Sequence, residues 1–268
     1  MQSGQVSWIT GASSGIGEAV AKLLVTEHHK LILSARREEE LERVKRECVS
    51  SGADADNIFV LPLDVSNIDS LQQKVHIAHQ HFGQIDFLYN NAGVSQRSLC
   101  LDTDMATYKT LFDVDVFGQI ALTKLVLPLM IEQGGGHLSV TASIAGKIGV
   151  PLRTGYCAAK HAIIGFFDAL RAETAQHNIY VSTVVPGFIR TNISTAALRG
   201  NGEKFGQVDD DIKAGMDVNK AAEKIIASWK KGKLEIPVGK GNEMHALWLK
   251  RLVPKLMHKI MAKRALSN

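Results

Sequence analysis

The stretch Thr10–Gly17, which reads TGASSGIG, decides the fold of this chain. It directly follows the apolar run Val6–Ile9 (VSWI), which has the length of a buried strand, and it leads into a helical pattern over Ile16–Thr26. Glycines in such a turn let the backbone approach a pyrophosphate, and the following helix offers free N–H groups and a positive dipole end. Strand, turn and helix together predict a dinucleotide-binding site.

The rest of the chain alternates short apolar runs with amphipathic helical patterns. This alternation predicts an α/β fold of Rossmann type, a doubly wound parallel sheet with helices on both faces. Seven strands are expected, at Val6–Thr10, Leu31–Ala35, Ile58–Pro62, Phe87–Asn90, His137–Thr141, Tyr180–Val185 and Leu234–Val238. Helices are expected at Ile16–Thr26, Glu38–Ser51, Ile68–Phe82, Met105–Glu132, Gly155–Gln176 and Asn219–Lys231.

No composition break or internal repeat divides residues 1–243, so we expect one catalytic domain there, followed by a basic tail over 244–268. The segment 194–217 is glycine-rich and weakly periodic. We expect it to form a lid over a binding site, because such a stretch inside a compact domain is more often functional than structural.

Positive charge is concentrated in the tail. The formal net charge is +4, but after Glu243 there is no acidic residue, and six lysines and arginines follow. Residues 1–243 are therefore slightly acidic, which argues against a general nucleic-acid surface.

Cysteine use and hydropathy indicate a compartment. The three cysteines form neither a paired framework nor a CxxC motif, which favours a reducing environment. No signal peptide precedes the first strand, and no apolar run approaches the ~20 residues of a membrane-spanning helix. We therefore expect a cytoplasmic protein without a spanning anchor; these features leave surface attachment open.

Tyr156 and Lys160 lie one helical turn apart and project from the same helix face. A free phenol titrates near pH ~10 and is a poor proton donor or acceptor at neutrality. A neighbouring ammonium favours the phenolate, so we expect Lys160 to lower the pKa of Tyr156. Alone, the pair would suit any amphipathic helix, but with the glycine turn it predicts a proton-transfer centre beside a dinucleotide.

The end of the second strand indicates which dinucleotide is bound. Sites for the unphosphorylated ribose usually carry an acidic residue there. This chain has Arg36 and Arg37 instead, and two guanidiniums without a carboxylate suit a 2′-phosphate. We therefore expect NADP(H), the alternative being that both arginines merely begin a charged helix. Within that helix, Glu39 and Arg43 have the spacing of an ion pair.

Further motifs complete a recognisable set. They are LDV at Leu63–Val65, NNAG at Asn90–Gly93, Ser143, PG at Pro186–Gly187, and Thr191. With these, the chain resembles the short-chain dehydrogenase/reductase family over nearly all of residues 5–240. Within it, SQRSLC at Ser95–Cys100 and GYCAAKHA at Gly155–Ala162 resemble the member-seven branch, especially its B form.

The resemblance implies roles for three residues. Tyr156 would pass a proton to the substrate oxygen, Lys160 would hold the nicotinamide ribose, and Ser143 would orient the substrate carbonyl. It also implies a lipophilic alcohol or carbonyl substrate of the steroid or retinoid kind, and a homodimer or homotetramer.

The expected cofactor site draws on most of these motifs. By the resemblance, Asp64 and Val65 lie at the adenine, Ile189 and Thr191 meet the carboxamide, and Asn90 orders the strand end. Besides Tyr156 and Lys160, the expected cofactor-binding residues are Thr10, Gly11, Ser13, Ser14, Gly15, Ile16, Gly17, Arg36, Arg37, Asp64, Val65, Asn91, Ala92, Gly93, Pro186, Gly187, Ile189 and Thr191.

Asp115 departs from the family pattern. It stands in Val114–Gly118 (VDVFG), where the family usually has an Asn whose main-chain carbonyl holds a water linked to the lysine. The carbonyl survives the exchange, so we expect Asp115 to keep its catalytic place with a displaced pH optimum. The alternative is a catalytically slow NADP(H)-binding regulatory or interaction protein. A nucleotide-sugar epimerase is a weaker alternative, because its relatives have a shorter glycine spacing.

No metal site is expected. His76, His79 and His81 lie close together, but no cysteine or carboxylate stands nearby at ligand spacing, and a solvated helix face explains them.

The tail has an amphipathic pattern of its own. Pro254 predicts a break at which a second helix starts. Such a segment either makes peripheral contact with an anionic membrane surface or packs on the sheet or on a second subunit. Its basic residues are Arg251, Lys255, Lys259 and Lys263, and its apolar residues are Leu249, Leu252, Val253, Leu256, Met257 and Ile260.

Overall fold

The computed structural model describes residues 3–266 and contains, over that range, a parallel seven-stranded sheet in the order β3-β2-β1-β4-β5-β6-β7. The order reverses between β1 and β4, which is where ligands bind in doubly wound sheets. The predicted Rossmann-type fold is confirmed. The strands are β1 (Val6–Thr10), β2 (Lys30–Ser34), β3 (Ile58–Val60), β4 (Phe87–Asn90), β5 (Gly136–Thr141), β6 (Ile179–Pro186) and β7 (Glu235–Val238).

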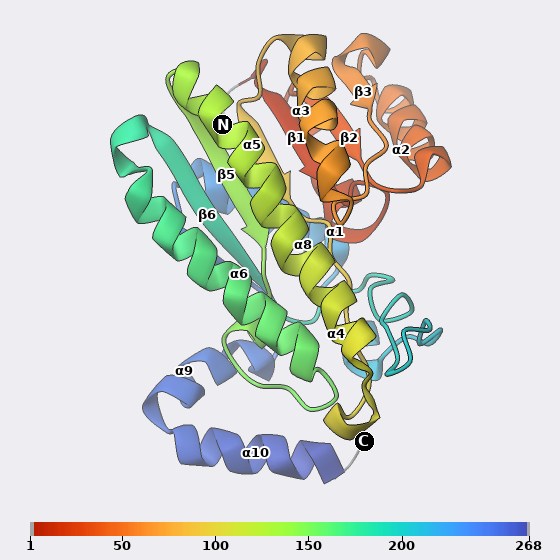
Figure 1. The fold of residues 1–268 in the computed structure, drawn as a ribbon, viewed down its shortest axis with the longest axis vertical. Helices are drawn as coiled ribbons and strands as arrows, with labels where there is room; N and C mark the ends of the chain where they lie inside the picture. The colour runs from red at the N-terminus through yellow and green to blue at the C-terminus, as the bar shows by residue number, and fades with distance from the viewer. Residues whose placement is uncertain (1–2, 267–268) are drawn as a thin grey trace.

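Helices cover both faces of the sheet. In the view of Figure 1, α3 (Ile68–Phe82), α5 (Gly118–Glu132) and α6 (Thr154–Glu173) lie in front. The opposite face packs against α1 (Gly15–Thr26), α2 (Glu38–Ser50) and α8 (Val218–Lys230). The other α-helices are α4 (Met105–Phe112), α7 (Asp210–Lys213), α9 (Ala246–Leu252) and α10 (Pro254–Leu266).

The two-residue period of the strands divides the core in two. In β1, Ile9 belongs to the cluster under α1, α2 and α8, whereas Trp8 belongs to the cluster under α3, α5 and α6. Leu33 and Ile32 of β2 divide in the same way. Because both faces are covered, these strands carry apolar side chains on each side, so they read as continuous apolar runs.

The long helix expected over Met105–Glu132 is interrupted. A π-helical turn, Asp113–Phe117, separates α4 from α5. Gly118 begins α5 in close contact with Val65, because a Cβ at Gly118 would lie 2.3 Å from the Val65 carbonyl oxygen. The turn widens the helix where Asp115 points inward, and such π turns often occur at functional sites.

The same span corrects a second expectation. By length and composition, Met105–Glu132 is apolar enough to cross a membrane, contrary to our prediction that no segment is. Half of the most apolar 18-residue stretch of this span is buried. Helix α5 packs Leu122, Val126 and Met130 into the core beside α3. The apolar composition is therefore that of a core helix.

The tail forms two helices, as Pro254 predicted. They lie at one end of the molecule's longest axis (Figure 1). Ala246 of α9 and Met257 of α10 are buried against Ile144 and Ile148, which follow β5. The tail thus packs on the segment that follows β5, at the carboxyl end of this strand.

Candidate active site

The glycine turn is shaped for close backbone approach. Gly11 and Gly15 have φ values of +65° and +61°, which side-chain-bearing residues rarely adopt. A Cβ at Gly17 would lie 2.4 Å from the Gly11 carbonyl oxygen. Helix α1 begins at Gly15, and Ser14 makes no side-chain capping bond to it. The first N–H groups of α1 are therefore available to an anion.

Asn91, rather than Asn90, holds this turn in place. Its amide donates to the carbonyl oxygens of Thr10 (3.1 Å) and Gly11 (3.4 Å). The Thr10 hydroxyl accepts from the backbone N–H groups of Asn91 and Ala92, both at 3.0 Å. Asn90, the last residue of β4, is fully buried and donates to Thr123 of α5, so it fastens the strand end to that helix.

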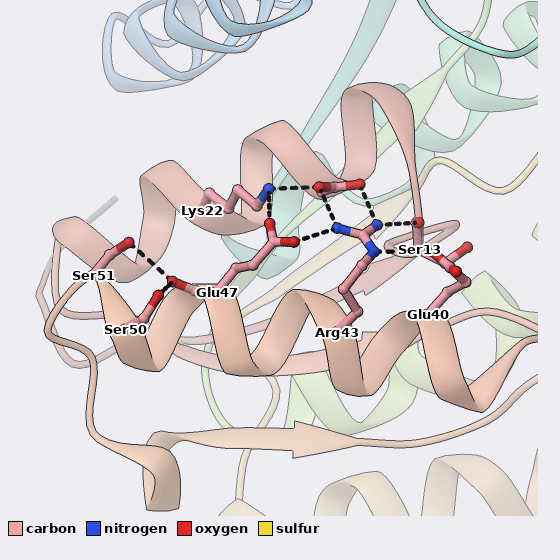
Figure 2. Close-up of polar contacts among 8 residues, drawn as sticks. Ser13, Lys22, Glu40, Arg43, Glu47, Ser50 and Ser51 are labelled. Atoms are coloured by element: carbon pink, nitrogen blue, oxygen red, sulfur yellow. Dashed lines mark hydrogen bonds and ion pairs between the residues drawn. The ribbon is translucent and has the colours of Figure 1, made fainter.

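An ion-pair cluster joins α1 to α2 beside the turn (Figure 2). Arg43 contacts Glu40 and Glu47 on its own helix, at 3.0 and 2.8 Å, and Glu18 of α1 at 2.9 Å. It also donates to the carbonyl oxygen of Ser13 at 3.2 Å. Burial of Glu18 opposes its ionisation, but hydrogen bonds from Arg43 and Lys22 outweigh burial and lower its pKa. The cluster fixes the turn to α2; Glu39, which we expected to pair with Arg43, is not the partner.

The residues expected to select the cofactor lie along the edge beyond the turn. Arg36 and Arg37 are exposed directly after β2, next to the glycine turn because Ala12 N donates to the Ser34 carbonyl. Asp64 lies on the neighbouring segment, which follows β3. Leu63 N of that segment donates to Ala35 O at 2.9 Å. These side chains do not line the cavity that holds Tyr156.

The three expected catalytic side chains converge. Ser143 ends the segment after β5, and its hydroxyl accepts from Ala145 N at 3.1 Å and lies 3.5 Å from the Pro186 carbonyl. Lys160 Nζ lies 5.7 Å from the centre of the Tyr156 ring and donates to Thr141 O at 2.9 Å. Tyr156 and Lys160 project from one face of α6, as their spacing predicted.

The electrostatics of Tyr156 differ from our expectation. Burial raises the pKa of Tyr156, and Asp115 raises it further. The opposing effects of Lys160 and of a hydrogen bond with Ser143 do not overcome burial. The predicted net lowering of the Tyr156 pKa was therefore wrong.

Asp115 lies in the same centre. Its Oδ1 accepts from Val94 N at 3.0 Å and lies 3.6 Å from Lys160 Nζ, while the side chain is completely buried. Burial raises the pKa of Asp115 to about 6, against the lowering effect of Lys160. Asp115 thus connects the NNAG loop to Lys160.

Gln96 and Arg153 hold the start of α6, and sequence reasoning did not assign them a role. The buried Gln96 amide oxygen accepts from the backbone N–H groups of Gly155 (2.7 Å) and Tyr156 (3.3 Å). Arg153 donates to Ser95 Oγ at 2.7 Å and to Asp209 at 2.8 Å. Gln96 stands in the branch motif Ser95–Cys100, which gave no indication of its contact with α6, and Arg153 stands in no motif.

A cavity of about 820 Å³ opens beside these side chains. Ser143 and Tyr156 line one part of it, and Ile16 and Thr191, next to the glycine turn, line another. Pro186, Gly187 and Ile189 also border it. Its remaining wall is largely apolar and includes Ile144, Ile148, Val150, Leu249 and Met257.

Segment 194–217 forms part of this wall through Ile212, Ala214 and Gly215. A buried carboxylate, Asp209, fixes it by contacts with Arg97 (2.5 Å) and Arg153 (2.8 Å). The segment is thus tied to the same arginine that supports the start of α6.

Within residues 3–266, no group of three or more His, Cys, Asp or Glu side chains is arranged to hold a metal ion. His81 instead stacks on Phe59, with ring centres 3.9 Å apart.

Comparison with known proteins gives consistent results. The model of the short chain dehydrogenase family matches residues 5–202. A Drosophila melanogaster protein, Dehydrogenase/reductase SDR family protein 7-like, is 41% identical over 98% of this chain and 81% of its own length. Human Dehydrogenase/reductase SDR family member 7 is 48% identical over 73% of this chain and 58% of its own length. The Bos taurus Dehydrogenase/reductase SDR family member 7B is 36% identical over 96% of this chain and 80% of its own length.

Solved structures share the fold. A short chain dehydrogenase/reductase from Burkholderia phymatum in complex with NAD aligns with a TM-score of 0.83, at 24% identity over 95% of each chain. A metagenomic short-chain oxidoreductase in complex with NADP aligns with a TM-score of 0.72, at 27% identity over 88% of this chain and 97% of its own.

Proposed function

Because the chain belongs to the short chain dehydrogenase family, we propose that it uses NADP(H) to interconvert a lipophilic alcohol and its carbonyl. Its relationship to the member 7 and 7B proteins is the one that its motifs indicated. One observation carries the proposal: Ser143 and Tyr156 open into a largely apolar cavity that continues to the glycine turn.

The chain's residues fit a dinucleotide. The uncapped start of α1 suits a pyrophosphate, and the Gly11–Asn91 contacts hold the turn open for it. Lys160 would hold the nicotinamide ribose, and Ile189 and Thr191 would meet the carboxamide. The nicotinamide supplies or takes up the hydride when it is bound.

Proton transfer falls to the protein. The Ser143 hydroxyl orients the substrate oxygen, and the Tyr156 hydroxyl holds the proton that this oxygen gains or loses. Burial raises the pKa of Tyr156, which favours the protonated phenol as a proton donor to a carbonyl. We therefore propose that Tyr156 donates the proton when the carbonyl is reduced.

The substrate is inferred from the cavity. An apolar wall favours a lipophilic molecule, because burying its surface supplies most of the binding free energy. A volume of about 820 Å³ accommodates a molecule of steroid or retinoid size.

Turnover with Tyr156→Phe tests the reaction. NADPH consumption should be measured with steroids, retinaldehyde, quinones and aliphatic ketones. Tyr156→Phe should lose about 10²–10⁴-fold in kcat while NADPH binding is retained. Tyr180→Phe is the matched control, because the Tyr180 hydroxyl donates to Lys233 O on another element. Equal activity of wild type and Tyr156→Phe would remove Tyr156 from the mechanism.

The cofactor preference rests on Arg36 and Arg37. Their exposed guanidiniums stand where a 2′-phosphate needs charged donors. Arg36→Ala/Arg37→Ala should weaken NADPH binding by about 10- to 100-fold and leave NADH binding nearly unchanged. Arg46→Ala, which changes an exposed arginine on the following helix α2, should alter neither. An unaltered NADPH/NADH ratio in the double variant would contradict the assignment.

A slow, cofactor-binding regulatory protein is the second candidate. The contact of Asp115 with Lys160 favours it, because a carboxylate there further raises the pKa of Tyr156. Cofactor binding without turnover on any carbonyl would favour this candidate, and a large gain in turnover from Asp115→Asn would support it further.

A further inference from the structure

The two C-terminal helices present apolar side chains to solvent. Leu252 is 73% exposed, and Trp248, Val253, Leu256 and Ile260 are also exposed. Together with the basic side chains between them, these residues form the α9–α10 face. The turn Cys100–Asp102, which carries the exposed Leu101, lies at the same end of the molecule's longest axis (Figure 1).

Helix α10 arranges its side chains in rows four residues apart. Met257 and Met261 pack on the body of the protein. Leu256 and Ile260 form the neighbouring exposed row. The next row is basic and exposed, and it consists of Lys255, Lys259 and Lys263.

The charge of this face has one sign. The chain has no acidic residue after Glu243, and Arg251 adds a fourth exposed cation to the three lysines. Arg264 instead turns inward to Asp211, so it fastens α10 to segment 194–217. Apolar side chains flanked by exposed cations match the interface of a bilayer that contains anionic lipid.

The cavity reaches this same face. Trp248, Leu252, Val253 and Ile260 are exposed, and they also line the cavity that holds Tyr156. An apolar route therefore runs from the α9–α10 face to the catalytic side chains.

We propose that the α9–α10 face docks on an anionic phospholipid bilayer and places the cavity mouth at the lipid surface. A second copy of the chain is the weaker occupant, because a twofold contact would bring the lysine rows of both copies together. That a lipophilic substrate enters from the bilayer rests on the proposed function; the docking itself does not.

Co-sedimentation of the full chain with vesicles tests the docking. The protein should bind phosphatidylcholine vesicles containing phosphatidylserine more tightly than vesicles of phosphatidylcholine alone. Lys255→Gln/Lys259→Gln should weaken binding by at least about tenfold. Leu256→Ser should also weaken it severalfold, because it removes apolar surface from the interface. Neither substitution lies in the cavity wall.

Two controls carry the same chemical changes elsewhere. Leu234 is 49% exposed and Leu256 is 46% exposed, so Leu234→Ser matches Leu256→Ser at the amino end of β7. Lys231→Gln/Lys233→Gln removes two exposed lysines from the loop before β7, so it matches Lys255→Gln/Lys259→Gln in charge. Both controls should bind vesicles like the wild type.

The outcomes separate the two proposals. The docking would be overturned if the wild type did not bind vesicles, or if the controls lost as much vesicle binding as the test variants. So would sedimentation velocity showing a dimer that Leu256→Ser dissociates while vesicle binding is unchanged. Turnover of a water-soluble carbonyl without vesicles should be the same in all variants. Vesicle binding without turnover on any carbonyl would sink the proposed function and leave the docking standing.

Discussion

At Asp115, a carboxylate without exposed surface lies 3.6 Å from the Lys160 ammonium. Attraction between two such charges is opposed by the loss of their hydration, which for buried groups is the larger effect unless further hydrogen bonds compensate. Asp115 Oδ1 has one such bond, from Val94, whereas Oδ2 has no hydrogen-bond partner within the described residues. The raised pKa of Asp115 follows from this imbalance.

Stability against pH tests this view of Asp115. Burial raises its pKa from 3.8 to about 6, so its contribution to stability is fully present below pH 3.8 and is lost as the pH rises through about 6. Asp115→Asn does not titrate. Its stability relative to the wild type should therefore improve between pH 4 and 7, by about 3 kcal/mol at most.

Urea denaturation at pH 4.5, 6 and 7.5 measures this difference. The difference in stability between Asp115→Asn and the wild type should become constant above pH 7. Parallel stability curves for Asp115→Asn and the wild type would mean that Asp115 keeps an ordinary pKa in the folded protein.

At the scale of elements, local periodicity was sufficient for most of the fold. The strands β1 and β4 and helix α3 have the predicted bounds, and most other elements differ by one or two residues. The π turn at Asp113–Phe117 was not predictable, because the contact of Gly118 with Val65 joins segments about fifty residues apart. Arg43 shows the same limit: its spacing suggested an intrahelical partner, but its position beside Glu18 depends on helix packing.

The site was predictable to a similar degree. The i,i+4 spacing placed Tyr156 and Lys160 on one face, because helix geometry requires it. The pKa of Tyr156 depends on burial, which spacing does not specify. Gln96 was missed because its role depends on backbone groups of α6 that are remote in the sequence.

Segment 194–217 provides a prediction at this scale. The Asp209 side chain is 7% exposed and lies between arginines that are 22% and 13% exposed. Asp209→Asn removes the negative charge that pairs with both guanidiniums. We expect a loss of about 2 kcal/mol, below the range for a fully buried pair because the arginines reach solvent. Urea denaturation measures it, and hydrogen exchange of residues 194–217 should become faster.

Asp210→Asn is the adjacent control. Asp210 pairs with Lys213 in full solvent exposure, so its loss should leave stability and exchange unchanged. If Asp209→Asn behaves like Asp210→Asn, the segment is held by its apolar contacts and not by the arginines.

At the scale of the whole molecule, the cavity joins parts of the chain that are far apart in sequence. Tyr156 lies on α6, Ile212 lies in segment 194–217, and Met257 comes from α10. The amphipathic pattern of the tail predicted a helix with an apolar side. It did not predict that this side would face the cavity, because that depends on where the sheet directs the chain after β7.

Met257→Trp tests whether α10 limits substrate size. Met257 is buried and lines the cavity, so a larger side chain should fill part of it. We expect kcat/KM for a steroid-sized ketone to fall by tenfold or more, while kcat/KM for a small aliphatic ketone changes less than threefold. The ratio of the two values is the measurement, because it cancels any loss of folded enzyme.

Leu256→Trp is the control, since Leu256 is the adjacent residue, is exposed and lies outside the cavity wall. It should leave the ratio unchanged. Overpacking by Met257→Trp can destabilise the protein by about 1–3 kcal/mol, so both variants should be compared below their unfolding transitions. An equal fall for large and small ketones in Met257→Trp would mean that α10 supports the fold and does not select the substrate.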